Sequence, residues 1–171
     1  MPRNFSSLTP SEVLQAAISI EQRNADIYHR FAEMFTEFAD EESLEIASVF
    51  WEMAVEERGH RALLEEKYVR AYGPLSGTFT EHELCELVEV PKLETADIFG
   101  SSSEASARER ALLVAVQAEI SAQHFYAELA ERTPKGPLKH IFEELALMED
   151  DHVTILESKL QSDSVTKETV Q

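Results

Sequence analysis

The sequence is poor in cysteine, glycine and proline, and each shortage excludes a class of structure. Its single cysteine, Cys85, cannot form a disulfide within the chain, and there is no CxxC pair from which to build a thiolate metal site. Five glycines and six prolines in 171 residues are too few for the turn-dense pattern of an all-β domain. We therefore expect an all-α domain in a reducing compartment, the cytoplasm.

Positive charge and long apolar runs are also scarce. Fifteen Lys and Arg residues face 33 Asp and Glu residues, which gives a formal net charge of −18. Such a charge repels nucleic acid and anionic membrane surfaces, whereas it attracts cations. No run of about 18 uncharged apolar residues occurs, and the N-terminal segment lacks the apolar core of a signal peptide. We expect neither a nucleic-acid partner nor a membrane partner.

Helix start and stop signals divide the chain into four long helices. Thr9, Pro10 and Glu12 form a capping box with proline at the first helical position, and Gly73-Pro74 ends the second helix. A second Pro/Gly cluster separates the last two helices. The predicted helices span about residues 10–38, 41–72, 103–132 and 137–160.

The connection between the second and third helices, residues 74–102, is long and contains three Gly/Pro breaks. It includes a possible short helix over 81–89. A connection of this length allows the second and third helices to run parallel. The sequence thus predicts a four-helix bundle of two helical hairpins joined by a long crossover, with the domain over 1–160 and a polar tail over 161–171.

The two hairpins look like duplicated halves. EQRNADIYHRFAE, which begins at Glu21, aligns with EISAQHFYAELAE, which begins at Glu119. In the second helix of each hairpin, Glu57 and His60 align with Glu149 and His152. A single Glu-x-x-His motif on a helix can arise by chance. Two such motifs at aligned positions of a duplicated hairpin are not explained in this way.

A glutamate interrupts the apolar face of every predicted helix, and on two helices a histidine follows three residues later. A spacing of three places both side chains on one face, about 4.5 Å apart along the axis. Four buried carboxylates would repel one another or be forced to protonate, and two divalent cations would neutralise them. The predicted ligands of this dinuclear metal site, which would also be its catalytic residues, are Glu21, Glu57, His60, Glu119, Glu149 and His152.

The expected metal is iron, with manganese or zinc as possible substitutes. Carboxylate and imidazole ligands suit iron and manganese, whereas zinc usually takes fewer ligands, richer in Cys and His. Glu57 and Glu149 would bridge the two ions, and Glu21 and Glu119 would each bind one ion. A purely structural alternative would neutralise the glutamates through arginines instead, but the nearby Arg23 and Arg58 fall off the apolar faces.

Two tyrosines, Tyr28 and Tyr126, follow the glutamates of their own helices by seven residues, about 10.5 Å along the axis. Each is too far from that glutamate to touch it but could donate a hydrogen bond to a ligand on a neighbouring helix. The alternative is simple packing in the core. The remaining histidines have no partner at ligand spacing and are interpreted as surface residues: His29, His82, His124 and His140.

The E-x6-Y pattern of the first and third helices, together with ExxH in the second and fourth, resembles the rubrerythrin branch of the ferritin-like superfamily. The resemblance spans about residues 10–160. It implies that the six residues bind two irons, which cycle between ferrous and ferric states while they reduce peroxide or dioxygen. It also implies a homodimer.

Three departures from related patterns refine this expectation. Rubrerythrins proper carry a C-terminal rubredoxin domain with four cysteines, which is not found here, so an external electron donor is expected. An additional rubrerythrin glutamate is replaced by Ala122, which weighs against peroxidase activity and leaves a more symmetric site, like that of bacterioferritin. The bacterioferritin haem ligand is replaced by Arg58, so no haem is expected.

Three functions remain open at this stage. The first is a di-iron oxidase or peroxidase. The second is an iron-storage protein that uses the same site as a ferroxidase centre, for which the acidic surface would favour cation uptake. The third is a sensory or adaptor domain.

Overall fold

The computed structural model describes residues 7–87 and 104–169, and this part of the chain contains helices but no strands. Four helices are long: α1 (Pro10–Phe38), α2 (Glu41–Tyr72), α5 (Glu104–Arg132) and α6 (Pro137–Thr169). A short helix, α3 (Glu81–Leu87), follows α2. The expectation of an all-α fold with four long helices is confirmed.

Local capping signals set the helix ends. The Thr9 hydroxyl accepts a hydrogen bond from the Glu12 amide at 3.3 Å, and the Glu12 carboxylate accepts one from the Thr9 amide at 2.9 Å. Ala39 adopts a left-handed conformation with φ 60°, and Asp40 caps α2 by accepting from the Ser43 amide at 2.9 Å. The helices of the first hairpin therefore begin and end where the sequence predicts.

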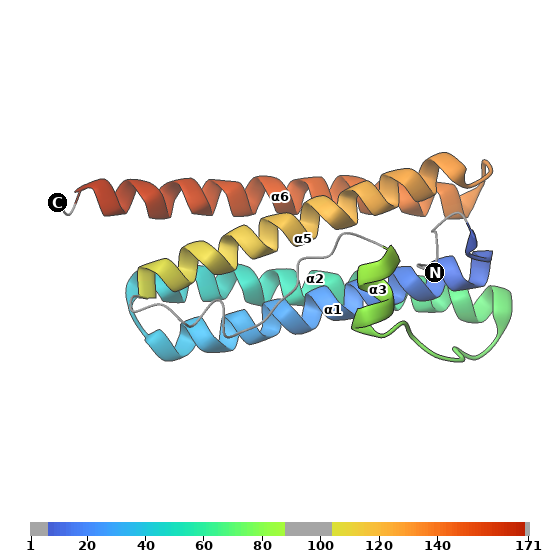
Figure 1. The fold of residues 1–171 in the computed structure, drawn as a ribbon, viewed down its shortest axis with the longest axis horizontal. Helices are drawn as coiled ribbons and strands as arrows, with labels where there is room; N and C mark the ends of the chain where they lie inside the picture. The colour runs from blue at the N-terminus through green and yellow to red at the C-terminus, as the bar shows by residue number, and fades with distance from the viewer. Residues whose placement is uncertain (1–6, 88–103, 170–171) are drawn as a thin grey trace.

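The last helix is longer than expected. It was predicted to end near Leu160, but α6 continues to Thr169 and extends past the beginning of α5 (Figure 1). The segment after Leu160 is polar but contains no glycine or proline, so nothing in it interrupts the helix. The domain boundary at residue 160 stays a prediction. The end of the predicted crossover helix (88–89) and the start of the third helix (103) lie outside the described residues.

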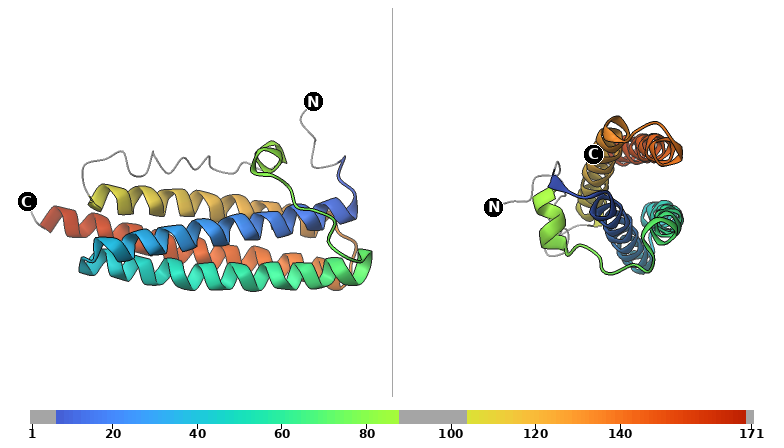
Figure 2. Two further views of the ribbon diagram at one scale, coloured as in Figure 1. Left: turned by 90° about the horizontal axis from the view of Figure 1, so that it is seen from below. Right: turned by 90° about the vertical axis from the view of Figure 1, so that its right-hand side faces the viewer.

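The four long helices form a bundle of two antiparallel hairpins, α1 with α2 and α5 with α6 (Figures 1 and 2). Helices α2 and α5 run in the same direction, as the crossover topology requires (Figure 1). Helix α3 packs against α1 on the outside of the bundle. None of the described helices combines the length and the apolar character needed to cross a membrane.

A buried arginine links the two hairpins at one end of the bundle. Arg108, near the start of α5, lies 3.2 Å from the Asp40 carboxylate and donates to the Ser43 hydroxyl at 3.1 Å. Burial opposes ionisation of Asp40, but hydrogen bonds from Ser43 and the charge of Arg108 lower its pKa below the ordinary value. This contact fixes α5 against the turn between α1 and α2.

The core consists of two apolar clusters along the bundle. One includes Leu14, Tyr126 and Phe142, and the other includes Phe35, Phe50 and Leu112. In each long helix, a polar segment lies between the residues contributed to the two clusters. The buried glutamates of the next section occupy this middle layer.

Candidate metal centre

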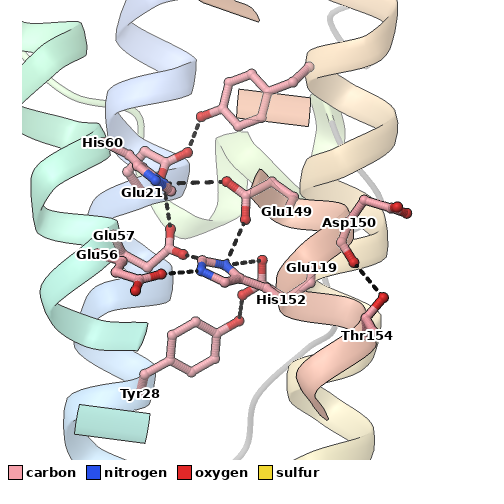
Figure 3. A network of polar contacts seen from close by, with 11 residues as sticks. Glu21, Tyr28, Glu56, Glu57, His60, Glu119, Glu149, Asp150, His152 and Thr154 are labelled. Carbon is pink, nitrogen blue, oxygen red and sulfur yellow. Dashed lines mark hydrogen bonds and ion pairs between the residues drawn. The ribbon is translucent and has the colours of Figure 1, made fainter. Parts of the chain in front are cut away.

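Each long helix contributes one glutamate to the middle layer of the bundle. Glu21 lies on α1, Glu57 on α2, Glu119 on α5 and Glu149 on α6, and all four are 0% exposed. His60 and His152 follow the α2 and α6 glutamates by three residues and point into the same layer (Figure 3). The structure thus brings together all six residues that the sequence singled out.

Three carboxylates surround the Nδ1 atom of His60. It lies 3.3 Å from Oε2 of Glu21, 3.5 Å from Oε1 of Glu149 and 3.8 Å from Oε2 of Glu57. These four residues offer ligand atoms that all lie within 4.8 Å of one another, which is compact enough to hold one metal ion.

The environment of His152 repeats this arrangement. Its Nδ1 atom lies 3.2 Å from Oε1 of Glu57, 3.2 Å from Oε2 of Glu149 and 3.5 Å from Oε2 of Glu119. The ligand atoms of these four residues again lie within 4.8 Å of one another. A second, separate set of atoms could therefore hold a second ion.

Glu57 and Glu149 belong to both groups. Each directs one carboxylate oxygen towards His60 and the other towards His152. Glu21 approaches only His60 and Glu119 approaches only His152. Two carboxylates are thus shared between the histidines and two are not. One glutamate from each of two helices, with Glu-x-x-His from each of the other two, is also the ligand set found in di-iron carboxylate bundles.

Two buried tyrosines hold the terminal carboxylates across the α1–α5 interface. Tyr28 on α1 donates a hydrogen bond to Oε1 of Glu119, and Tyr126 on α5 donates one to Oε1 of Glu21. Both tyrosines are fully buried. Each tyrosine therefore reaches a glutamate on the neighbouring helix, and the reciprocal contacts orient both carboxylates.

The pKa values of the four glutamates separate them into the same two pairs, Glu21 with Glu119 and Glu57 with Glu149. Burial, followed by repulsion from Glu57 and Glu149, raises the pKa of Glu21 and of Glu119 well above the usual value. Burial also opposes ionisation of Glu57 and Glu149, as does repulsion from Glu149 in the case of Glu57. Close polar contacts, chiefly with the imidazoles for Glu57 and with Glu119 for Glu149, nevertheless lower the pKa of each. The two central glutamates are therefore ionised more readily than Glu21 and Glu119.

The histidines respond to that charge. Burial disfavours the imidazolium form, yet the contacts with Glu149, Glu21 and Glu57 raise the pKa of His60 to about 12. The contacts with Glu119, Glu149 and Glu57 raise the pKa of His152 as well, against the same opposing effect of burial. The two imidazoles thus offset part of the negative charge of the buried carboxylates.

Protonation nevertheless does not give every polar atom of the site a hydrogen-bond partner. Several buried atoms in it take part in no aligned hydrogen bond: Oε2 of Glu21, both oxygens of Glu57, Nδ1 of His60, Oε2 of Glu119 and Oε1 of Glu149. Buried polar atoms without partners cost free energy, whereas all of these atoms are suitable metal ligands. Two divalent cations would match the four carboxylate charges, so the residues present fit a dinuclear metal centre.

Metal binding is expected to release protons. Since the pKa values of Glu21, Glu119, His60 and His152 are raised, a metal ion must compete with protons for these groups. The affinity should consequently increase with pH between about pH 5 and 8. Addition of Zn(II) to the metal-free protein in weakly buffered indicator solution measures the release, and binding without acidification would contradict this prediction.

Two polar residues, Glu56 on α2 and Asn24 on α1, carry no motif that would have singled them out. Glu56 lies beside the ligand Glu57, and its Oε2 is 2.7 Å from Nε2 of His152 (Figure 3). Asn24, one turn after Glu21, is buried, and neither its amide oxygen nor its amide nitrogen has a hydrogen-bond partner among the described residues. Asn24 follows Glu21 by three residues, a spacing that places both on one face of α1.

The four histidines that were interpreted as surface residues lie outside the site. His82 and His140 are exposed, His29 is half-buried, and each lies within 4.0 Å of a glutamate on its own helix. His124 is also exposed. Cys85 lies on α3, outside the bundle, and is partly exposed.

Comparison with known proteins gives one match. The family model for rubrerythrin matches residues 12–101 and 110–171, a span that contains all six residues of the site. Comparisons with curated proteins and with solved structures found no match. The family match agrees with the E-x6-Y and ExxH patterns, which now lie on the four helices of one bundle. The chain therefore belongs to the rubrerythrin family.

Proposed function

We propose that this chain is a di-iron carboxylate protein that reduces peroxide or dioxygen. The observation that carries the proposal is the division of the oxygens of Glu57 and Glu149 between the two histidines. Such a division suits a pair of metal ions, because each ion would share both carboxylates with the other. Glu21 with His60, and Glu119 with His152, would complete the two positions.

Iron is the metal proposed, with manganese or zinc as substitutes. The six side chains offer mostly carboxylate oxygen with one imidazole for each position, which suits iron and manganese better than tetrahedral zinc. A bound iron pair would supply the electrons for the reduction of an oxygen species, and an external donor would restore them. Arg58 occupies the position of the bacterioferritin haem ligand, so no haem is proposed.

The chain's own residues would prepare the site for this chemistry. Glu57 and Glu149 would neutralise the metal charge, while burial excludes bulk water from the layer. Tyr28 and Tyr126 would hold Glu119 and Glu21 in orientation through their hydrogen bonds. Both tyrosine hydroxyls retain their protons at neutral pH, because burial and then the nearest glutamate charges raise the pKa of each well above its usual value.

A second candidate is iron storage through ferroxidase activity at the same site. Ala122 is buried at the position where rubrerythrins have an additional glutamate, so the two metal positions have equal numbers of ligands. The net charge of −18 would also favour cation uptake. A sensory or adaptor role has no comparable support from an observation.

Assembly would distinguish the two candidates. Exposed apolar side chains lie on α2 and α6, among them Trp51, Val55, Leu147 and Ile155, and a second copy of the chain could cover them. We propose a homodimer in the cytoplasm for the oxidase or peroxidase. A cage of many subunits would instead favour storage, and the mass in solution separates these outcomes.

The test of the proposed function is anaerobic loading with Fe(II), followed by metal analysis and stopped-flow oxidation. We expect two irons per chain and rapid formation of a ferric absorption band with peroxide, dioxygen or both. The faster of the two oxidants identifies the reaction. A chain that retains no iron would overturn the proposal, and one that binds iron but reacts with neither oxidant would overturn its oxidoreductase part.

A further inference from the structure

The two histidines of the site differ in the hydrogen-bond partner of Nε2, the ring nitrogen that does not face the buried carboxylates. In His152, Nδ1 faces the buried carboxylates while Nε2 lies 2.7 Å from Oε2 of Glu56, on α2 (Figure 3). Glu56 is 59% exposed along its side chain, so it reaches His152 from the surface of the bundle. The contact joins α2 to α6 beside the buried carboxylates.

The duplication shows which residue should hold His60 in the same way. The second helices of the two hairpins align at an offset that places Glu57 on Glu149 and His60 on His152. At the same offset, Glu56 falls on Met148, whose thioether is only a weak hydrogen-bond acceptor. Within the described part of the chain, no hydrogen bond to Nε2 of His60 is found.

The exposure of the two rings follows the same asymmetry. The His152 side chain is 3% exposed, whereas the His60 side chain is 12% exposed. The two histidines otherwise have matched surroundings, each with three carboxylates near Nδ1. The main difference between the two halves of the site is therefore the Glu56 carboxylate at Nε2 of His152, for which His60 has no counterpart among the described residues.

A carboxylate on the far nitrogen of a metal-binding histidine has known effects. It fixes the tautomer that presents the other nitrogen to the metal, restrains the ring, and increases the basicity of the ligand. Removal of such a partner typically lowers metal affinity about 10- to 100-fold. His152 has this support from Glu56, and His60 does not.

We propose that the two metal positions are unequal, and that Glu56 is the positioning residue that makes the His152 position the tighter of the two. This inference rests on the proposed function, since it assumes that the six residues bind two ions. The His152 position fills first and retains its ion. The ion at His60 is held more weakly and exchanges with solvent.

Two reciprocal substitutions test the inference, because each makes the two halves alike. Glu56→Met gives methionine at both aligned positions, and Met148→Glu gives glutamate at both. Metal-free protein is titrated anaerobically with Fe(II) in a calorimeter, and two stepwise affinities are fitted. We expect Glu56→Met to weaken the first step about 10-fold or more, with little change in the second. Met148→Glu should strengthen mainly the second step by a similar factor.

The separation of the steps distinguishes positioning from repulsion between the two ions. Repulsion weakens the second step in any variant, but it gives no reason for Glu56→Met to act on the first. Glu52→Met is the matched control for the lost charge, because Glu52 is exposed on the same helix and one turn before Glu56. It should leave both affinities unchanged.

A spectroscopic measurement supports the assignment to one histidine. In protein loaded with Co(II), the paramagnetically shifted imidazole N–H signals report each ring, and Glu56→Met should move one signal and leave the other in place. An unchanged first step in Glu56→Met, or an effect equal to that of Glu52→Met, would overturn the inference while leaving the proposed function intact. Wild-type protein that binds no iron would overturn the proposed function and the inference with it.

Discussion

Replacement of Glu57 and Glu149 together by alanine is expected to abolish stoichiometric iron binding. Each of these glutamates offers one oxygen to each half of the site, so the double variant loses two ligands at both positions. The negative charge that balances the cations is lost as well, since these are the two glutamates whose pKa values are lowered. The affinity should fall by more than about 100-fold, beyond the usual effect of losing an indirect partner.

Iron analysis after anaerobic loading and gel filtration measures this loss, and the absorbance that develops on exposure to air provides a second reading. A suitable control is Glu52→Ala with Glu144→Ala, which removes two exposed carboxylates from the same helices at equivalent positions. The control should retain two irons per chain. Circular dichroism establishes that both variants remain helical, and retention of two irons by Glu57→Ala/Glu149→Ala would refute the assignment of the bridging ligands.

The sequence was sufficient to predict most helix ends because the signals that set them are local. The capping box of Thr9 and Glu12 is formed by residues three apart, and Gly73 ends α2 with a positive φ of 84°. The end of α6 was predicted less well. Polarity after Leu160 indicated exposure to solvent, but an exposed helix and an exposed tail have similar composition.

The convergence of the six site residues was also predictable, since periodicity places each glutamate on a core face. Their role as ligands stays a prediction. The partners of Tyr28 and Tyr126 could not be assigned from sequence, because they depend on how α1 and α5 are aligned along the bundle. The sequence provided only the distance between each tyrosine and the glutamate on the same helix, and this distance excluded a contact between those two residues.

Glu56 was missed for a related reason. It lies next to a core residue but on an exposed part of α2, where glutamates are common and usually interact with solvent. Its contact with His152 depends on the relative position of α2 and α6, which no motif encodes. The aligned repeats did contain one signal: Glu56 and Met148 differ at a position where the neighbouring ligands are identical.

Metal loading is expected to raise the thermal stability of the protein strongly. A ligand that binds only the folded state stabilises it by about 2.7 kcal/mol at 100 times its dissociation constant. Two positions filled to this extent would contribute about 5 kcal/mol, which corresponds to about 10–20 °C in Tm for a domain of this size. Scanning calorimetry of chelator-treated and Mn(II)-loaded protein, which avoids redox chemistry, measures the difference.

Removal of the two central carboxylates should leave the metal-free chain as stable as wild type or more stable. The double variant Glu57→Leu/Glu149→Leu replaces two buried carboxylates, whose oxygens are incompletely paired, with apolar groups that suit the adjoining clusters. Replacement of a complete buried ion pair by apolar groups is often neutral or stabilises a protein by about 1–4 kcal/mol. The pair is removed in full here, because His60 and His152 can lose their protons once the carboxylates that raise their pKa values are gone. The metal-free variant should therefore melt at or above the temperature of metal-free wild type, and Mn(II) should not raise it further. A variant that melts well below metal-free wild type would show that the glutamates stabilise the bundle without metal, contrary to a site whose burial cost is offset by bound ions.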